Sequence, residues 1–598
     1  MVFLKMSKIV EYVRANKLFL ISLIVFNLFI SSWNYSYLII SEGWFLLPAK
    51  LINEGQLPYR DFYAYLPPFY YWYSYFLFLL GDELIFNARV AGQLVFSLIF
   101  YFSYEFYRIN FNKTVSLIST FVSLLIYLNT NAIFTYDFTH LVTLFYLIAF
   151  FFILKSKKSN SSAFLSGFFG TLLVLTKQSN GSVIFFFLVF IFLLINKENI
   201  RRIYLPFLGA LLAGLPFLIH IISYGGLGDF VDQVVFQAGS TKGGIYHSLT
   251  TLFPPTSSYY SLNTLKYFLF EIFFPLFIFI FISIRSNKNS FLWKDDFKNN
   301  QNLWILLSLL ISAILTIYFT LPSIKDTPFG SYILSYFWNR AFVWSGYYAI
   351  AILLLFNKYN FFNRESLLFL ISLIFASATS AGLTPTSIYL HLGFLIAILL
   401  SMKSFLNVLK YTGFVFAIIL TISSIQGRDS IQYQWWGYLS LKGSNLSYEI
   451  PAIRKIKNQT ISRDLVLLNQ KIRKCENAPK NLLSFPHAPL LNLTTGLNPP
   501  GKFTTYWFDF ASNQNVMEDL NRLKGSKLDL IAIIHLEESA YTGHNSLFRN
   551  NNGLSQTVML DYIAQITNSE EYEILLSKQI SGFDVDIYYS KVLKCESQ

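Results

Sequence analysis

Long apolar runs recur along most of this 598-residue chain and constrain its fold more than any other feature. A helix that crosses the hydrocarbon core of a bilayer needs about 20 apolar residues. By this criterion we expect about thirteen spans. They lie near residues 18–40, 87–107, 115–130, 138–154, 163–176, 181–196, 203–222, 267–284, 302–321, 341–356, 366–380, 388–402 and 410–426. The composition agrees with a membrane protein, because 54% of the residues are hydrophobic and only 13% are charged.

The segments between these runs carry an orientation signal. If the N-terminus lies in the cytoplasm, every cytoplasmic loop is basic, as the positive-inside rule requires. These loops are 108–114, 155–162, 197–202, 285–301, 357–365 and 403–409. The alternation holds only if residues 69–80 form a short juxtamembrane or re-entrant helix that does not cross. The net charge of +13 therefore indicates membrane orientation and not nucleic-acid binding.

The opposite loops are mostly poor in Lys and Arg, and they share one side of the membrane. We expect them at residues 41–86, 131–137, 177–180, 223–266, 322–340 and 381–387. The loop 223–266 is long, glycine-rich and aromatic, which favours a mobile lid over a site. We identify no cleavable signal peptide, because the first apolar run is long enough to span and remain.

The chain divides into a membrane part and a polar C-terminal part. Residues 1–427 are predicted to form a polytopic α-helical module, and residues 428–598 an extracytoplasmic α/β domain. Strand-like runs occur near 528–534 and 584–589. Helical stretches near 451–472, 515–524 and 557–567 accompany them.

The chain has two cysteines, Cys475 and Cys595, both in the C-terminal part. Neither has the spacing of a metal ligand. Two unpaired cysteines are the simpler expectation. A disulfide is the alternative, because an extracytoplasmic domain lies in an oxidising compartment.

The stretch from Ser41 to Pro68 concentrates charges and helix breakers between two membrane-seeking segments. Charges held against a bilayer are costly, so they usually mark a site or a wet surface. Glycine and proline at Gly55, Pro58 and Pro67 predict a loop folded in short pieces.

This stretch resembles the first loop of the GT-C glycosyltransferases. The resemblance rests on Glu42-Gly43, on Gly55-Gln56-Leu57-Pro58-Tyr59-Arg60-Asp61-Phe62 and on Pro67-Pro68. The nearest group includes protein O-mannosyltransferases, lipid A aminoarabinose transferases and RgtA/B/C/D-like proteins. The resemblance implies transfer of a sugar from a polyprenyl-phosphate carrier. The family's leading Asp is Ser41 here, so Glu42 or Asp61 must supply the acid.

Such a transfer needs a carboxylate that accepts the acceptor's proton and cations that stabilise the leaving phosphate. The candidate acids are Glu42, Asp61 and Asp137. Each has a structural alternative: a solvated helix end for Glu42, a loop clamp with Arg60 for Asp61, and a helix N-cap for Asp137.

Several polar residues on the same predicted side are candidates for substrate binding. They are Tyr59, Arg60, His140, Lys177, Gln178, Arg340, Tyr389 and His391, with Arg89 and Lys242 as further cations. Lys177 has a second interpretation, in which it snorkels to the lipid headgroups. Arg340 is equally consistent with an interfacial anchor. No cofactor is assigned, and a divalent metal is an open alternative to side-chain cations.

A segment after the last span also resembles the group. It comprises Phe485-Pro486-His487-Ala488-Pro489, then Asn492 to Gly496, then Pro499-Pro500. We favour a loop that caps the domain over a direct substrate contact.

The sequence therefore predicts an integral membrane glycosyltransferase, placed in a bacterial plasma membrane, that acts on the extracytoplasmic side. Its partners would be a polyprenyl-phosphate sugar, an acceptor and membrane lipids. A transporter or flippase for lipid-linked glycans is the alternative from another class, and a non-catalytic lipid-sugar binding protein is a third. The chain has no P-loop, dinucleotide-binding, HExxH or CxxC motif, which argues against direct use of ATP or a nucleotide sugar.

Overall fold

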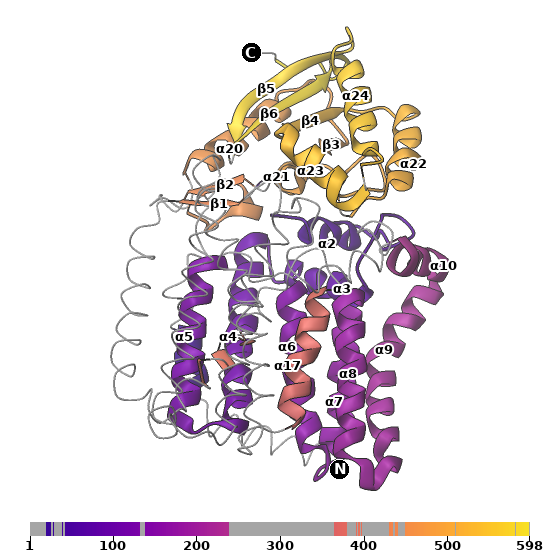
Figure 1. Ribbon diagram of the computed structural model, residues 1–598. Coiled ribbons are helices and arrows are strands. Elements are labelled where there is room, and N and C mark those ends of the chain that lie inside the picture. The colour runs from indigo at the N-terminus through magenta and orange to yellow at the C-terminus, as the bar shows by residue number, and fades with distance from the viewer. Residues whose placement is uncertain are drawn as a thin grey trace, which may run out of the picture.

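The computed structural model describes a helical bundle with an α/β domain on one end (Figure 1). The described residues are 19–25, 28, 39, 42–131, 138–237, 364–378, 390–391, 393–394, 396–397, 430–433, 437–440, 449–457 and 459–596 except 509, 550 and 581.

The described part of the bundle consists of long apolar helices. They are α4 (Leu84–Asn110), α5 (Lys113–Asn131), α6 (Phe138–Ser156), α7 (Asn160–Thr176), α8 (Gln178–Ile195), α9 (Tyr204–Ser223) and α17 (Arg364–Ala378). Among the described residues, four helical stretches are long and apolar enough to cross a membrane: Leu84–Asn110, Phe138–Ser156, Gln178–Ile195 and Arg201–Ser223. They coincide with four predicted spans, which confirms a membrane-spanning helical protein. The predicted spans at 267–284, 302–321, 341–356 and 410–426 lie outside the described residues, as do most of 18–40 and part of 388–402.

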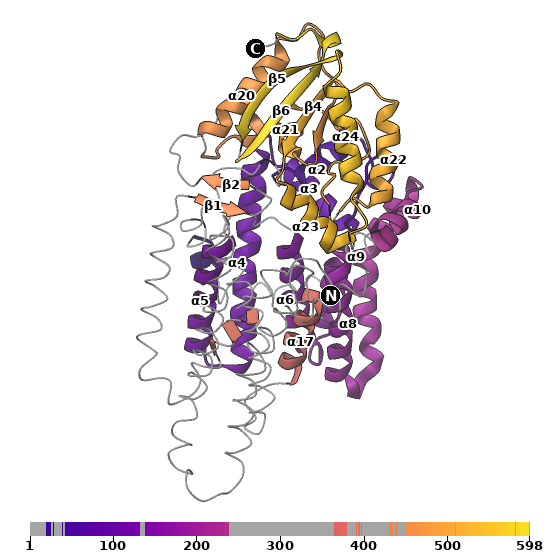
Figure 2. The same ribbon diagram turned by 45° about the horizontal axis from the view of Figure 1, so that its top comes forward.

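Two short helices lie across the end of the bundle, between it and the α/β domain (Figures 1 and 2). They are α2 (Leu46–Asn53) and α3 (Pro68–Phe78). Pro68 is the first residue of α3, a position where its missing N–H leaves no hydrogen bond unmade. The 11 residues of α3 span about 16 Å, far less than the bilayer core. The prediction that residues 69–80 do not cross is therefore confirmed.

The C-terminal part contains a four-stranded sheet with helices packed on it. The strands are β3 (Leu482–Phe485), β4 (Leu530–His535), β5 (Tyr572–Ile580) and β6 (Phe583–Ser590), in the order β3-β4-β6-β5. β3 and β4 are parallel, and the other pairs are antiparallel. The helices are α20 (Gln459–Arg473), α21 (Pro489–Thr495), α22 (Asn513–Lys524), α23 (Glu538–Arg549) and α24 (Ser555–Thr567). Residues 530–534 of β4 are all buried, which identifies β4 as a core strand.

A separate hairpin precedes this sheet along the chain. It pairs β1 (Ser430–Tyr433) with β2 (Gly437–Ser440). β4 and β6 overlap the strands predicted at 528–534 and 584–589, and α20, α22 and α24 overlap the predicted helices.

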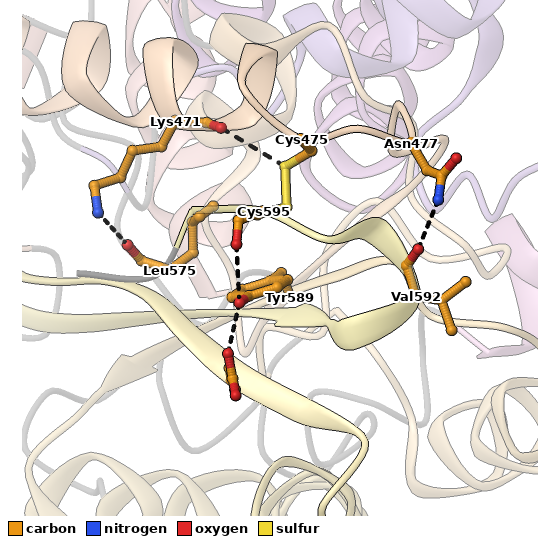
Figure 3. The surroundings of a disulfide bond; sticks show 8 residues. Lys471, Cys475, Asn477, Leu575, Tyr589, Val592 and Cys595 are labelled. Atoms are coloured by element: carbon orange, nitrogen blue, oxygen red, sulfur yellow. Dashed lines mark hydrogen bonds between the residues drawn. A yellow bond between two sulfur atoms is a disulfide. The ribbon is translucent and has the colours of Figure 1, made fainter.

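A disulfide joins Cys475 to Cys595 across 120 residues of sequence, so the expectation of two unpaired cysteines is wrong (Figure 3). Cys475 follows α20, and Cys595 follows the short helix after β6. Two side chains near Cys475 make further links: Lys471 donates to the Leu575 carbonyl in β5, and Asn477 donates to the Val592 carbonyl near Cys595. The disulfide therefore links the segment after β6 to the C-terminal end of α20.

The basic loops lie at one end of the bundle, and the first loop lies at the other. The turns α4–α5, α6–α7 and α8–α9 lie at the end away from the α/β domain (Figure 1). These turns contain the basic loops 108–114, 155–162 and 197–202. The first loop, the α7–α8 turn and the segment after α9 lie at the other end, as the alternation in the sequence predicts.

Candidate functional site

Glu42 lies in a turn that leads into α2, and its carboxylate is completely buried against Arg89 of α4. Both side chains are 0% exposed. Arg89 Nη2 lies 2.6 Å from Glu42 Oε1, and Arg89 Nε donates to the same oxygen at 3.2 Å. The solvated helix end considered for Glu42 is therefore wrong. A buried charge needs a partner of opposite charge, and Arg89 is the partner that the structure provides.

Gly43, the residue after Glu42, allows the turn to pack closely against α21. Gly43 has φ +89°, a conformation that L side chains rarely adopt. A Cβ at this position would lie 2.7 Å from Leu493 Cδ1 and 3.1 Å from the Leu490 backbone nitrogen, both in α21. The Glu42 turn is thus pressed directly against a helix of the C-terminal domain.

Trp44 continues the contact with the C-terminal domain. Its ring lies 4.9 Å from the His487 ring and 4.5 Å, edge-on, from Phe510. His487 is 0% exposed, and neither ring nitrogen has a hydrogen-bond partner among the described residues. Burial lowers the pKa of the His487 imidazole to about 3, so the ring is neutral. The segment around His487 therefore packs against the first loop, whereas the sequence favoured a loop that caps the domain.

A row of buried polar side chains continues from Arg89 along α4. Gln93 and Ser97 follow at successive intervals of four residues, which places all three on one face of the helix. His140 on α6 faces the same region, because its ring lies 6.2 Å from Phe96 of α4. Arg89 and His140 were predicted from the sequence, whereas Gln93 was not, although it lies four residues after Arg89.

Lys177 sits in the turn between α7 and α8 and is only 6% exposed. Its Nζ lies 4.8 Å from the centre of the Phe138 ring, a cation–π contact. Phe138 in turn packs edge-on against Phe45, three residues after Glu42, with ring centres 5.4 Å apart. The structure therefore turns Lys177 inward toward the first loop and does not place it on the lipid-facing surface that snorkelling requires.

Tyr59 and Gln178 hold the backbone of the first loop. Tyr59 has φ +71°, is 0% exposed and donates its hydroxyl to the Leu66 carbonyl at 2.8 Å. The Gln178 amide donates to the carbonyls of Tyr65 and Val234. Gln233, which sequence analysis missed, accepts from the Ala64 N–H and donates to the Tyr59 carbonyl. These side chains are committed to loop geometry, so direct substrate contact by Tyr59 is not what the structure favours.

Arg60 and Asp61 form the loop clamp that was the structural alternative for Asp61. Their side chains are 46% and 30% exposed and make two hydrogen bonds, at 2.8 and 2.9 Å. Asp61 also accepts from the Leu57 N–H. The hydrogen bonds from Arg60 lower the pKa of the Asp61 carboxyl, so it stays ionised.

The lid-like loop 223–266 is described only at its start. There α10 (Leu227–Phe230) and a π-helical segment, Val231–Gln237, extend from the end of α9. Gln237 accepts a hydrogen bond from Asn515 of α22. The start of this loop therefore contacts the C-terminal domain as well as the first loop.

Four predicted residues lie outside the described part of the chain, and His391 lies away from Glu42. Asp137, Arg340 and Tyr389 lie outside the described residues, as does Lys242. His391 is buried and within 3.1 Å of the Leu370 carbonyl, and the adjacent Leu390 carbonyl accepts from Tyr107. Tyr107 lies 18 residues beyond Arg89 on α4, about 27 Å along the helix, so the structure does not bring His391 to Glu42. Within the described ranges, no group of three or more His, Cys, Asp or Glu residues could hold a metal ion.

Residues 66–223 match the family model of dolichyl-phosphate-mannose-protein mannosyltransferases. This range begins at the end of the first loop and contains Arg89, His140, Lys177 and Gln178. The resemblance to GT-C glycosyltransferases is therefore confirmed over this range, which contains little of the motif that first suggested it. No curated protein matches the chain.

Two solved structures align with most of the chain. Both are ArnT from Cupriavidus metallidurans, one bound to undecaprenyl phosphate and the other in the apo state. Each is 12% identical to this chain, with TM-scores of 0.39 and 0.43. The alignments cover 95% and 96% of this chain and 97% and 98% of the ArnT chains.

Proposed function

We propose that this chain, whose residues 66–223 match a mannosyltransferase family, transfers a sugar from a polyprenyl-phosphate donor to an acceptor hydroxyl. The reaction would take place at the end of the bundle that carries the first loop and the C-terminal domain. The proposed acceptor is a lipid, glycan or protein.

The Glu42–Arg89 pair is the observation that carries this proposal. A buried ion pair contributes little net stability compared with apolar packing of the same volume. Its position also matters, because three structural units meet there: the first loop, α4 and α21 of the C-terminal domain. A charged pair placed at such a junction, within a glycosyltransferase-like bundle, is a strong candidate for a reaction centre.

The proposed chemistry uses Glu42 as the acid–base group. The acceptor oxygen attacks the anomeric carbon of the donor sugar, and the bond between that carbon and the phosphate oxygen breaks. The hydroxyl proton passes to the Glu42 carboxylate, and polyprenyl phosphate leaves. Arg89 would fix the orientation of the carboxylate, and the buried pair would have to become accessible to the acceptor when substrate binds.

Lys177 is the proposed electrostatic partner of the leaving phosphate. Its ammonium is held inside the protein, where a charge interacts more strongly than it does in water. His140 and Gln93, on helices that face each other beside Arg89, are proposed to line the donor site. Asp61 and Arg60 would shape the loop at its rim.

The same orientation that the sequence predicts is proposed for the protein. The basic turns would lie in the cytoplasm, and the first loop and C-terminal domain would lie outside. The Cys475–Cys595 disulfide supports this, because stable disulfides belong to oxidising compartments. Residues 1–427 and 428–598 remain the proposed division into a membrane module and an extracytoplasmic domain.

The decisive experiment measures transfer of radiolabelled sugar from polyprenyl phosphate in proteoliposomes. Glu42→Gln keeps shape but cannot accept the proton, so turnover should fall by about two to four orders of magnitude. Thermal unfolding and size-exclusion profiles establish that the variant is folded, and Glu42→Asp, which keeps the charge, should retain more activity.

Asp61→Asn is the matched control. It should retain most of the activity, because Asp61 lies in the clamp with Arg60. Near-normal turnover in Glu42→Gln together with an inactive Asp61→Asn would assign the acid to Asp61. Movement of a lipid-linked sugar across the bilayer without any transfer would instead support the transporter alternative, and binding of the donor without either process would support the non-catalytic one.

A further inference from the structure

An apolar groove lies among α6, α7, α8 and α9. It is a cavity of about 250 Å³, and its walls include Gly167, Gly170, Phe185, Phe192, Pro206 and Ala210. These helices include three of the stretches that are long and apolar enough to cross a membrane. The groove therefore lies within the part of the protein that faces lipid, and it is distinct from the site around Glu42.

Small residues let the helices that border the groove approach closely. α7 and α9 touch through their backbones: a Cβ at Gly167 would lie 1.9 Å from the Pro206 carbonyl oxygen, and one at Gly209 would lie 2.0 Å from that of Phe164. On the α8 side, a Cβ at Gly170 would lie 3.1 Å from the Phe185 ring. The glycines thus bring α7 and α9 close together, and the apolar groove beside this contact is lined by aromatic rings that suit a hydrocarbon chain.

The groove is next to the basic turns. Ile153 and Ile203 line it, two residues before Lys155 and one residue after Arg202. The turns 155–160 and 196–203 contain six cationic residues and one acid, Glu198.

Two of the cationic residues, Arg202 and Lys157, make contacts between the two turns. Arg202 Nη1 donates to the carbonyls of Ser156 at 3.0 Å and Lys157 at 2.6 Å. Lys157 pairs with Glu198 at 3.2 Å. The remaining exposed cations, Lys158, Lys197 and Arg201, take part in no ion pair within the described part of the chain. A cluster of positive charge therefore lies near the part of the groove that Ile153 and Ile203 line.

We propose that this place binds one anionic phospholipid of the leaflet on the basic side. One acyl chain occupies the groove, and the phosphate of the headgroup contacts Lys158, Lys197 and Arg201. Basic turns that only orient the protein in the membrane need no groove beside them. Here an apolar groove adjoins the cationic residues, and it gives an acyl chain of the lipid a place to bind. Tyr204, 55% exposed next to the groove residue Ile203, supplies the aromatic group that favours the headgroup level.

The test uses the full-length protein in neutral detergent and fluorescent phosphatidylglycerol as the probe. Wild type should bind it saturably, and unlabelled phosphatidylglycerol should compete about tenfold or more better than phosphatidylcholine with the same acyl chains. Ala210→Trp, which fills the groove, should weaken binding about tenfold or more. Leu211→Trp is the matched control: Leu211 is the next residue, is 42% exposed and does not line the groove.

A second pair of variants tests the headgroup independently of the groove. Lys158→Ala, Lys197→Ala and Arg201→Ala combined should abolish the preference for phosphatidylglycerol. The combination Arg463→Ala, Lys527→Ala and Lys578→Ala removes the same charge from the C-terminal domain and should leave binding unchanged. Equal competition by the two lipids, or equal binding by Ala210→Trp and Leu211→Trp, would overturn the proposal.

Discussion

The buried pair of Glu42 and Arg89 determines how any substitution there must be interpreted. Removing one member of a buried ion pair leaves the other charge uncompensated, which typically costs about 3 to 5 kcal/mol. Loss of activity on changing Arg89 would therefore mix folding with chemistry. Glu42→Gln also leaves the Arg89 charge uncompensated, but its amide oxygen still accepts a hydrogen bond from Arg89, so this variant disturbs the site less and its folding must be checked.

Lys177 tests the electrostatic part of the mechanism at the level of one charge. Lys177→Met keeps the length and apolar stem of the side chain but removes the ammonium. We expect the donor KM to rise roughly 10- to 100-fold, because hydrogen bonds to charged groups contribute about 1.5 to 3 kcal/mol. Steady-state kinetics with varied donor concentration measure this.

Lys113→Met serves as the control for Lys177→Met, since Lys113 is exposed at the other end of the bundle. Unchanged KM and turnover in Lys177→Met would show that Lys177 only packs on Phe138.

His487 gives the C-terminal domain a dependence on pH. Its folded-state pKa is about 3, whereas an unfolded histidine has a pKa of about 6.5. Below pH 6.5 the unfolded chain gains a proton that the folded chain does not, so stability falls as the pH decreases. The loss should approach about 2 kcal/mol at pH 5, at about 1.4 kcal/mol per pH unit.

Denaturant unfolding of the full chain between pH 7.5 and pH 5 measures the His487 effect. His487→Phe, which keeps a ring beside Trp44, should lose distinctly less stability over this range. Identical acid sensitivity of wild type and His487→Phe would refute the assignment.

At the scale of elements, α21 of the C-terminal domain supports the turn that carries Glu42. Gly43→Ala introduces a Cβ that meets Leu493 and the backbone of α21, in addition to the strain of a positive φ. We expect transfer to fall about tenfold or more, because a shift of the turn by even about 1 Å displaces the carboxylate. The radiolabelled transfer assay applies here without change.

Gly55 provides a closely matched control for Gly43. Its φ is +87°, and a Cβ there would have nothing within 4 Å. Gly55→Ala thus carries the backbone strain without the collision. If both alanine variants lose the same activity, contact with α21 does not position Glu42.

At the scale of the whole molecule, the C-terminal domain is joined to the first loop at several points. The Tyr63 N–H donates to the Lys502 carbonyl at 2.8 Å, and Lys455 pairs with Glu83 at 2.8 Å. Lys50 and Glu54 of α2 both hydrogen-bond to Asn498. The domain and the loop must therefore lie on the same side of the membrane.

Single cysteines decide which side that is. Lys527→Cys on the C-terminal domain should react with a membrane-impermeant maleimide in intact right-side-out vesicles. Lys113→Cys, in the α4–α5 turn, should react only after permeabilisation. The native cysteines do not interfere, because they are paired. The reverse labelling pattern would overturn the proposed orientation.

The sequence by itself determined the features that depend on local pattern. Bilayer thickness sets the length of an apolar span, so four spans among the described residues followed from the lengths of the apolar runs. The failure of residues 69–80 to cross followed from their short length and from the alternation of the basic loops. Glu42 could also be identified as a candidate from the sequence. A charged side chain directly after an apolar span has a high free-energy cost against the bilayer, so such a residue often marks a functional site.

Only the tertiary structure decided which partners these residues have. Arg89 lies 47 positions from Glu42, and Cys595 lies 120 positions from Cys475. Nothing in a local pattern specifies such pairs, because they arise when helices and domains pack. The same holds for Lys177, which faces Phe138 and not the lipid, and for Gln178, whose amide holds the backbone of the first loop. Chemistry at a polar side chain depends on burial and neighbours, and these exist only once the chain has folded.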